Sequence, residues 1–583
     1  LISKDRLIEE VWKGRAVTDG SLGKCIEELR EAFGPEAKRL IRNVRGRGYI
    51  FDADVTDPEH VLLQTSEQVD LVRVTVEEHE EIADAALRSA LQTSASIWIG
   101  RSILVGLGIL VVVISFIGYR AYSSRAANGA QIKSIAVLPF ENQTGDPTME
   151  YLADGLSESL INKLSQLPDV KVIARSSAFR YKGKEVNAQQ VATDLGVHAI
   201  LIGQLKQRGE DLLVSVELVD TRDRTQVWGD QYSRKSTDIQ ALQDEIARVI
   251  AKKLNSRSEE RQLTQHGTQD SQAYQFYLNG LFHFRKGGLD NTKKAIDYFN
   301  QAVALDSSFA LAWVAIADSN LYFAGNSLLD PKEARGKAKL ALQKALELDD
   351  GLPEAHVTLA IIHEQEWDWT GAEREYKRAL ELNPNSVRAH SRYAYFLSSM
   401  ERHTEAMAEI KRAQEIDPLD IGLKSREAWS LTLAGRHEES IEKYQQILNI
   451  DPDLRTSTGL GFAYENKALY AQAAEEFRKQ IELKGETTSG LIYLGYDLAM
   501  SGRKGEAQAI LARLKETKDY VSPEELAGLY AGLGDKEGAL AMLERAYQEH
   551  DLQLQVLKID RRLDSLRSDA RFQDLLRRVG LAL

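Results

Sequence analysis

The apolar side chains of the first fifty residues follow two different sequence periods. Residues 3–12 and 18–34 repeat apolar positions every three or four residues, the period of a helix that is buried on one face. In the second segment these apolar residues are Leu22, Ile26, Leu29 and Phe33. Two short strands, 39–44 and 49–51, follow on either side of a turn-forming RGRG sequence. The pattern predicts two helices and a hairpin, the order of elements in a winged helix-turn-helix.

An acidic stretch and then a long apolar run come next. Residues 56–96 hold nine acidic residues against two arginines and show no clear apolar period, which predicts a linker. Residues 102–119 carry no charge, and with the apolar residues before them they reach the roughly 20 needed to cross a bilayer. Trp98 and Tyr119 flank the run, where aromatic rings favour the membrane interface. We therefore expect one transmembrane helix over residues 97–119.

From residue 132 strands and helices alternate in a compact α/β pattern. Residues 133–142 predict a buried strand and residues 149–167 an amphipathic helix. A second strand follows, and then a short helix that ends at Gly196. Residues 198–234 predict a three-stranded antiparallel meander, and residues 238–254 predict a closing helix.

The last 310 residues repeat with a period of 34. The period is set by Asp349, Asn383, Asp417 and Asp451, and a proline follows each of the last three. Helix pairs that recur at this spacing are typical of tetratricopeptide repeats. A small residue marks the second helix of each pair, at Ala295, Ala338, Ala372, Ala406, Ser440, Ala474, Ala507 and Ala539. We expect about eight repeats, with nine extra residues between 318 and 337, and a concave face that binds a protein or peptide partner.

Charge and cysteine content restrict the possible functions. The chain has 87 acidic and 74 basic side chains, a formal net charge of −13, which argues against nucleic-acid binding over the whole surface but allows a local basic site. Cys25 is the single cysteine, so neither an intramolecular disulfide nor a cysteine zinc cluster can form. A buried or half-buried position for Cys25 is favoured over a redox switch.

The amino-terminal segment carries a family resemblance. Residues 17–34 followed by 40–51 resemble the carboxy-terminal half of the OmpR/PhoB-type winged-helix DNA-binding domain, and the variety joined to a transmembrane helix is the ToxR/CadC-like group. The resemblance implies that the second helix lies in the major groove and that the hairpin is a wing on the DNA backbone. Because the family domain has further strands and a helix before this point, we expect the head to be incomplete at its amino end.

The basic residues of this head are the expected DNA contacts. Residues 38–47 hold five positive charges and no acid, an electrostatic footprint for phosphate. The predicted DNA-binding residues are Lys24, Arg30, Arg42, Arg45 and Arg47. The outward face of the second helix also holds three glutamates, which repel phosphate.

The α/β region resembles a second family and suggests no chemistry. Its sequences IAVLPF, LADGLSESL and VWGDQY resemble the TolB-type amino-terminal domain. Asp154, Glu158 and Asp220 have no histidine or cysteine partner at metal-ligand spacing. His363 begins the sequence HEQE, but the position where a zinc-protease motif has its second histidine is Trp367. We therefore expect no enzyme activity, no catalytic residue, no metal site and no cofactor.

These patterns together predict a multidomain chain. The expected segments are an incomplete winged-helix DNA-binding domain (1–55), an acidic linker (56–96), the transmembrane helix (97–119), a TolB-like α/β domain (131–255), an all-α tetratricopeptide-repeat solenoid (271–550) and a capping helix (551–583).

The organisation predicts a membrane-anchored DNA-binding transcription regulator. Its partners would be double-stranded promoter DNA, the lipid bilayer, a protein or peptide on the repeats, and a second copy in a homodimer, because paired half-sites raise affinity. A head that binds DNA would place the amino end in the cytoplasm and the carboxy-terminal region beyond the inner membrane as a sensor. The alternative is a membrane-anchored interaction scaffold that works through its repeats and keeps a vestigial head.

Overall fold

The structure is a computed structural model that describes a hairpin near the amino end and most of the chain beyond residue 131. The described residues are 41–44, 48–51, 132–184, 187–209, 211–235, 238–254, 267–325, 331–451 and 458–581. The chain divides into two compact units, Leu1–Ile114 and Ser115–Leu583, and each is described by itself.

The described part of the first unit is a two-stranded hairpin. Strands β1 (Ile41–Val44) and β2 (Gly48–Phe51) pair antiparallel, with Ile41 opposite Phe51 and Val44 opposite Gly48. This pairing confirms the hairpin predicted from the RGRG turn. The two helices predicted before the hairpin and the acidic linker after it lie outside the described residues.

The predicted fold class and location need a correction. Among the helices described within residues 132–581, none combines the length and the apolar character that crossing a bilayer requires. The transmembrane helix predicted over residues 97–119 lies outside the described residues. An apolar run meets the length criterion without establishing a spanning helix, because helices buried in protein are also apolar. The membrane-spanning element, and the inner-membrane location that depended on it, are therefore withdrawn.

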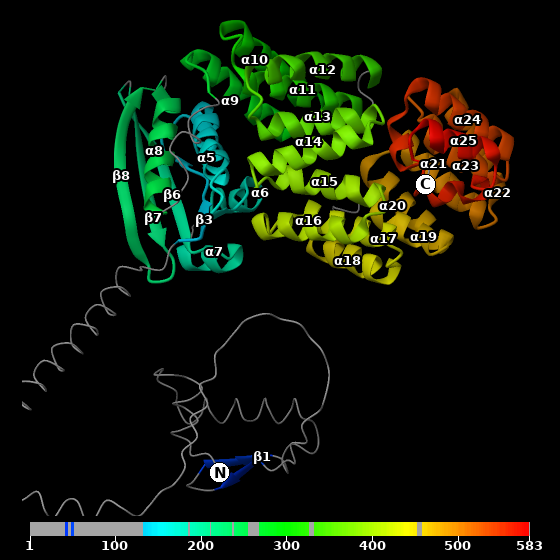
Figure 1. Ribbon diagram of the computed structural model, residues 1–583, viewed down its shortest axis with the longest axis horizontal. Helices are drawn as coiled ribbons and strands as arrows, with labels where there is room; N and C mark the ends of the chain where they lie inside the picture. Colours follow the sequence, from blue (N-terminus) through cyan, green and yellow to red (C-terminus); the bar gives the residue numbers. More distant parts are fainter. Residues whose placement is uncertain are drawn as a thin grey trace, which may run out of the picture. The chain divides into compact units, whose positions relative to one another are not determined.

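The second unit begins with an α/β domain (Figure 1). Its elements are β3 (Ser134–Val137), β4 (Glu141–Asn142), η1 (Pro147–Met149), α5 (Glu150–Ser165), β5 (Lys171–Val172), α6 (Arg175–Ala178), η2 (Phe179–Tyr181), α7 (Ala188–Leu195), β6 (Ala199–Arg208), β7 (Asp211–Asp220), β8 (Thr225–Lys235) and α8 (Ile239–Lys253). The helix predicted to end at Gly196 does so, with that glycine in the left-handed conformation (φ 61°).

One mixed sheet organises this domain. Its strand order is β5-β3-β6-β7-β8, in which β3 pairs parallel with β5 and β6, whereas β6, β7 and β8 form the predicted antiparallel meander. Alternate side chains of β7 from Leu212 to Leu218 are buried, and those between them are more exposed. Helix α5 contacts β3 and α8 contacts β8, and α5 lies between the sheet and the repeats (Figure 1).

Eight helix pairs follow within the described residues. They are α9 (Ser271–Lys286) with α10 (Leu289–Leu305), α11 (Ala310–Gly325) with α12 (Pro331–Leu348), α13 (Pro353–Gln365) with α14 (Trp369–Leu382), α15 (Val387–Ser399) with α16 (His403–Ile416), α17 (Ile421–Leu433) with α18 (His437–Ile450), α19 (Gly459–Asn466) with α20 (Tyr470–Lys484), α21 (Thr488–Met500) with α22 (Lys504–Glu516), and α23 (Pro523–Leu533) with α24 (Lys536–Glu549).

Small residues hold each pair together. All eight positions predicted to mark the second helix, from Ala295 to Ala539, are at most 2% exposed. A residue of this size lets the two helix backbones approach closely, and Tyr376 and Phe477 then fill the space between neighbouring helices. Nine extra residues were predicted between 318 and 337. The described residues of this interval belong to α11 and α12, which are longer than the helices of the next repeat, and residues 326–330 lie outside the described part of the chain.

The carboxy-terminal segment differs from the single capping helix predicted for it. It forms two 3-10 turns, η6 (Leu552–Val556) and η7 (Arg561–Leu566), and one short helix, α25 (Ala570–Arg578). Each begins at an aspartate whose carboxylate accepts a backbone N–H two residues ahead, and these are Asp551, Asp560 and Asp569. Because these capping aspartates recur every nine residues, each of them begins a new element and the elements stay short.

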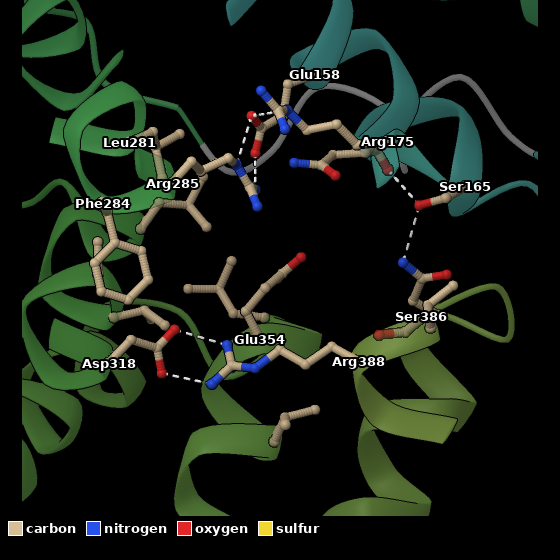
Figure 2. Close-up of a pocket in the computed structure, with 18 of the residues that line it drawn as sticks. Glu158, Ser165, Arg175, Leu281, Phe284, Arg285, Asp318, Glu354, Ser386 and Arg388 are labelled. Atoms are coloured by element: carbon tan, nitrogen blue, oxygen red, sulfur yellow. Dashed lines mark hydrogen bonds and ion pairs between the residues drawn. The ribbon is translucent and has the colours of Figure 1, made fainter. Parts of the chain in front are cut away.

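The α/β domain is docked on the turns between repeats. Asn385 Nδ2 donates to the carbonyl oxygens of Ser165 (3.0 Å), Leu167 (3.3 Å) and Val170 (3.2 Å) at the end of α5. One repeat later, Asp417 accepts from the hydroxyls of Ser176 and Ser177 on α6. Asn383 Nδ2 donates to Ser165 Oγ at 3.0 Å, and Ser165 is labelled beside the cavity in Figure 2.

The carboxy-terminal segment closes the array onto its own third repeat. Trp369 Nε1 donates to the Val579 carbonyl oxygen at 2.9 Å, and the Trp367 ring stacks on Tyr547 with centroids 5.1 Å apart. Lys558 and Glu401 form an ion pair at 2.6 Å. The repeats therefore surround an interior that the segment after α24 crosses.

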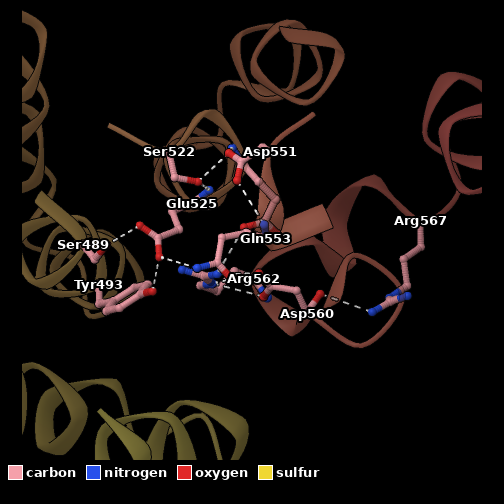
Figure 3. A network of polar contacts seen from close by, with 10 residues as sticks. Ser489, Tyr493, Ser522, Glu525, Asp551, Gln553, Asp560, Arg562 and Arg567 are labelled. Carbon is pink, nitrogen blue, oxygen red and sulfur yellow. Dashed lines mark hydrogen bonds and ion pairs between the residues drawn. The ribbon is translucent and has the colours of Figure 1, made fainter. Parts of the chain in front are cut away.

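A buried polar network holds that segment (Figure 3). Arg562 Nη2 lies 2.5 Å from Asp560 Oδ2, and Glu525 accepts from Ser489 Oγ (2.6 Å) and from the Tyr493 hydroxyl. Ser522 Oγ donates to Asp551 Oδ2 at 2.6 Å. The network ties α21, α23 and η7 together.

Two carboxyl groups near this network are buried without a matching cation. Asp497 is 0% exposed, and among the described residues neither of its oxygens has a hydrogen-bond partner. Burial raises the pKa of Asp497 to about 10 and that of Glu465 to about 8, because Arg562 compensates the lost hydration only in part.

Asn385→Ala tests the docking of the α/β domain. The substitution removes the donor of three buried carbonyl groups, so the free energy of unfolding in urea should fall by about 1–3 kcal/mol. Asn320→Ala is the matched control, since the Asn320 amide is equally buried and bonds only within its own helix. Equal losses in the two variants would contradict a special role for Asn385.

Asp497→Asn tests the buried carboxyl. A carboxyl with a raised folded-state pKa contributes its full stability below about pH 4 and loses it as the pH rises toward the folded-state value. The amide does not ionise, so the Tm should rise by about 2–5 °C near pH 8.5 and change little near pH 5. Glu482→Gln, at an exposed position, should have no such pH-dependent effect. An equal shift at both pH values would show that ionisation is not the cause.

Candidate functional site

The predicted DNA-binding residues fall mostly outside the described part of the chain. Arg42 lies in β1, where its backbone is opposite Ile50. Lys24, Arg30, Arg45 and Arg47 are not among the described residues, and in the sequence the last two lie between β1 and β2. The structure therefore places the strands of the hairpin, and the assignment of these five side chains to DNA stays a prediction.

A cavity of about 840 Å³ lies between the α/β domain and the repeats (Figure 2). Its walls come from α5 and α6 on one side and from α9, α11, α13 and α15 on the other. Leu552 and Gln553, from the segment that crosses the interior, also line it. Its volume is in the range of cavities that hold small molecules or several residues of a peptide.

One acid of the α/β domain binds two arginines at the edge of this cavity. Glu158, buried on α5, lies 3.0 Å from Arg175 Nε and accepts from Arg285 Nε at 2.9 Å. Burial opposes the charge of Arg285, but the Glu158 carboxylate outweighs it and raises the pKa of that guanidinium. Glu158 therefore joins the α/β domain to the first repeat through a charge-assisted pair.

A second cluster crosses three successive inner helices. Arg388 on α15 forms a bidentate pair with Asp318 on α11, at 2.6 Å for both contacts, and Thr358 Oγ1 of α13 donates to Asp318 at 2.7 Å. The Arg285 and Arg388 side chains are 43% and 36% exposed, although both lie deep in the unit. That exposed surface faces the cavity, where a ligand could reach it.

The acids noted in the sequence take part in ion pairs. Asp154 binds Lys182 at 2.5 Å, and Asp220 forms a two-point contact with Arg222 at 2.6 and 3.0 Å. His363 Nδ1 lies 2.9 Å from Asp368. Within the described residues no group of three or more histidine, cysteine or acidic side chains is arranged to hold a metal ion.

The contacts between the cavity residues carried no signal in the sequence, where Glu158 was noted only as an acid without a metal-ligand partner. Glu158 and Arg285 are 127 residues apart, and Arg388 and Asp318 are 70 apart, a spacing that is not a multiple of the repeat. Glu364, one residue after the histidine of HEQE, is also in the wall, and burial raises its pKa to about 7. The only local indication of the cavity wall in this segment was an acid, Glu364, at an inner-helix position.

Three family models match separate parts of the chain. Residues 1–51 match "Transcriptional regulatory protein, C terminal", and residues 130–249 match "HilA/YgeH-like transcriptional regulator, second domain". Residues 364–425 match "Tetratricopeptide repeat". The second match covers the region that resembles the TolB-type domain. A TolB structure from Acinetobacter baumannii is similar with 18% identity and a TM-score of only 0.17 over 21% of this chain and 28% of that one, so a TolB-type domain is not shown.

Curated relatives are similar over part of their length. Putative adenylate cyclase 3 of Rhizobium meliloti (strain 1021) is 30% identical over 236 residues, which are 39% of this chain and 40% of that protein. Transcriptional regulator HilA of Salmonella typhimurium is 22% identical over 371 residues, 62% of this chain and 53% of that protein. The chain thus spans about half the length, or less, of these relatives.

Solved structures add a distant likeness. A tetratricopeptide repeat protein from Parabacteroides merdae ATCC 43184 is similar with 12% identity and a TM-score of 0.35, over 46% of this chain and 99% of that one. The family matches and the described fold together show a chain that joins two domains of transcriptional regulators, an OmpR/PhoB-type carboxy-terminal domain and a HilA/YgeH-like second domain, to tetratricopeptide repeats.

Proposed function

We propose that this chain is a DNA-binding transcription regulator whose α/β domain and repeats form its effector-binding region. The observation that carries the proposal is the match of residues 1–51 to the regulatory carboxy-terminal domain, within which β1 and β2 form the expected hairpin. The hairpin sequence supports a phosphate contact, because residues 38–47 hold five basic side chains and no acid. Lys24 and Arg30 would add contacts from the helix in the major groove.

The effector region would work by binding. The charged groups at the cavity edge, Glu158 with Arg285 and Asp318 with Arg388, are paired in the free protein and are arranged as recognition groups. The regulator and repeat families favour a role without catalysis. The adenylate cyclase activity in the name of the Rhizobium relative is attributed to that protein and not to this chain. We therefore propose a non-enzymatic regulator without a metal or cofactor.

The repeats would bind a protein partner, and the protein would act as a homodimer on DNA. The docking at Asn385 and Asp417 supports a coupled response, because anything that shifts the third and fourth repeats also moves α5 and α6. A dimer would engage two half-sites and so raise the affinity for an operator.

Salt-dependent DNA binding tests the proposed function. Arg45→Ala and Arg47→Ala should each weaken binding of the full chain to double-stranded DNA, by a similar factor on every sequence, because both side chains are assigned to phosphates. Fluorescence anisotropy over a salt series should show the slope of log K against log salt fall by about 1 per arginine removed. Arg378→Ala, on the exposed face of α14, is the charge-matched control.

Two outcomes would contradict this function. Binding that does not depend on salt would show that the arginines do not neutralise phosphates. Absence of binding to any duplex, together with normal behaviour of a chain that lacks residues 1–55, would instead favour a scaffold that acts through the repeats.

A further inference from the structure

Two related five-residue sequences, which share a serine, an arginine and an alanine at the same places, lie on the inner wall of the repeats. Residues 391–395 read SRYAY and residues 425–429 read SREAW, one period of 34 apart. The first lies on α15 and the second on α17, which are neighbouring inner helices. The arginine and the aromatic residue are three positions apart within each sequence, so they share one helix face. Two arginines and two aromatic rings therefore stack along the same wall.

This wall joins two cavities. A second cavity of about 400 Å³ is lined by Arg426 and Trp429, and it meets the larger one at Tyr395 and Gln553, which line both. The Arg426 guanidinium lies over the Tyr395 ring, 5.1 Å from its centre. Aromatic side chains form much of the remaining lining, namely Tyr444, Phe462 and Tyr493.

The two arginines of these related segments differ from most others at these cavities. Of those others, Arg561 likewise has no carboxylate contact among the described residues, but it donates to the Asn466 carbonyl oxygen at 2.9 Å. Arg285, Arg388 and Arg562 each contact a carboxylate. Arg392 and Arg426 have no ion-pair partner among the described residues. Arg426 Nε and Trp429 Nε1 are also buried without a hydrogen-bond partner in that part of the chain. Leaving such groups unpaired is costly, which favours a missing negative group at this position.

One buried acid, Glu364, compensates these charges only in part. Glu364 lies within electrostatic reach of both Arg392 and Arg426 and accepts from the Tyr376 hydroxyl. Burial raises the pKa of Glu364 to about 7, so near neutral pH its negative charge is weakened. Burial, together with the neighbouring Arg392, lowers the pKa of Arg426.

We propose that Arg392 and Arg426 bind the anionic group of a small aromatic ligand whose ring packs on Tyr395 and Trp429. The cations supply charge-assisted hydrogen bonds for a carboxylate or phosphate, and the aromatic lining stacks on a planar body. A small molecule fits better than a long peptide, because the second cavity holds only about 400 Å³ and Gln553, Val556 and Ile559 of the crossing segment form part of its lining. An aromatic carboxylic acid and a nucleotide share this chemistry.

A matched pair of probes tests the site in the full chain. The charged probe is 8-anilinonaphthalene-1-sulfonate, and N-phenyl-1-naphthylamine has the same rings without the charge. Calorimetry should show one sulfonate probe bound per chain, and Arg392→Gln with Arg426→Gln should weaken that binding by roughly tenfold or more. Affinity for the neutral probe should not change, and Arg378→Gln should leave both affinities unchanged.

Competition then separates the two ligand sources. Displacement of the bound sulfonate probe by indole-3-acetate identifies a carboxylate site, and displacement by adenosine 5′-monophosphate identifies a phosphate site. Displacement by neither overturns the proposal, and so does equal binding of the sulfonate probe to the wild type and the double variant.

Thermal stability gives an independent measurement. Without ligand, Arg426→Gln should raise the Tm, because it removes a half-buried charge that has no ion-pair partner among the described residues. A lower Tm would show that Arg426 is a structural residue and would overturn its assignment to a ligand.

Discussion

The hydrogen bonds from the repeat turns to the end of α5 are the constraint on which the second unit depends. A turn between two helix pairs normally faces solvent, and its polar side chains cap the local backbone. Here Asn383, Asn385 and Asp417 also bond to backbone and hydroxyl groups of a different domain. Because successive turns lie one repeat apart, they present their polar groups at a fixed spacing, and the α/β domain is held at two points. The cavity exists because this docking places α5 opposite the inner helices.

The cavity and the crossing segment create an interior with unusual electrostatics. An adjacent carboxylate raises the pKa of an arginine there, as Asp318 does for Arg388, whereas burial raises the pKa of an acid without such a partner, such as Asp497. The same low polarisability strengthens a matched ion pair and penalises an unmatched one. Buried ionisable groups without a matching partner lower the stability of the fold. Their positions are therefore candidates for a functional role.

The repeats were predictable from the sequence because their packing is local. Each helix pair buries a small residue against its immediate neighbour, so Ala372 and Ala406 recur at the structural period. The meander between β6 and β8 was predictable for the same reason. The contact of Glu158 with Arg285 was not, because it joins separate domains and leaves no periodic pattern. The short turns after residue 551 were missed because an apolar period alone does not register the aspartates that cap each turn. That the side chains of the basic hairpin contact DNA is still a prediction from the sequence.

Closure of the array has a consequence for its evolution and mechanics. An open solenoid can gain or lose a repeat at little cost, since each unit touches only its neighbours, and it can stretch like a spring. The hydrogen bond from Trp369 to Val579 joins the third repeat to the end of α25. It can form only with the present number of repeats between these two residues. Duplication of one unit would carry α25 away from its partner. This array therefore has a fixed repeat count and resists extension as a ring does.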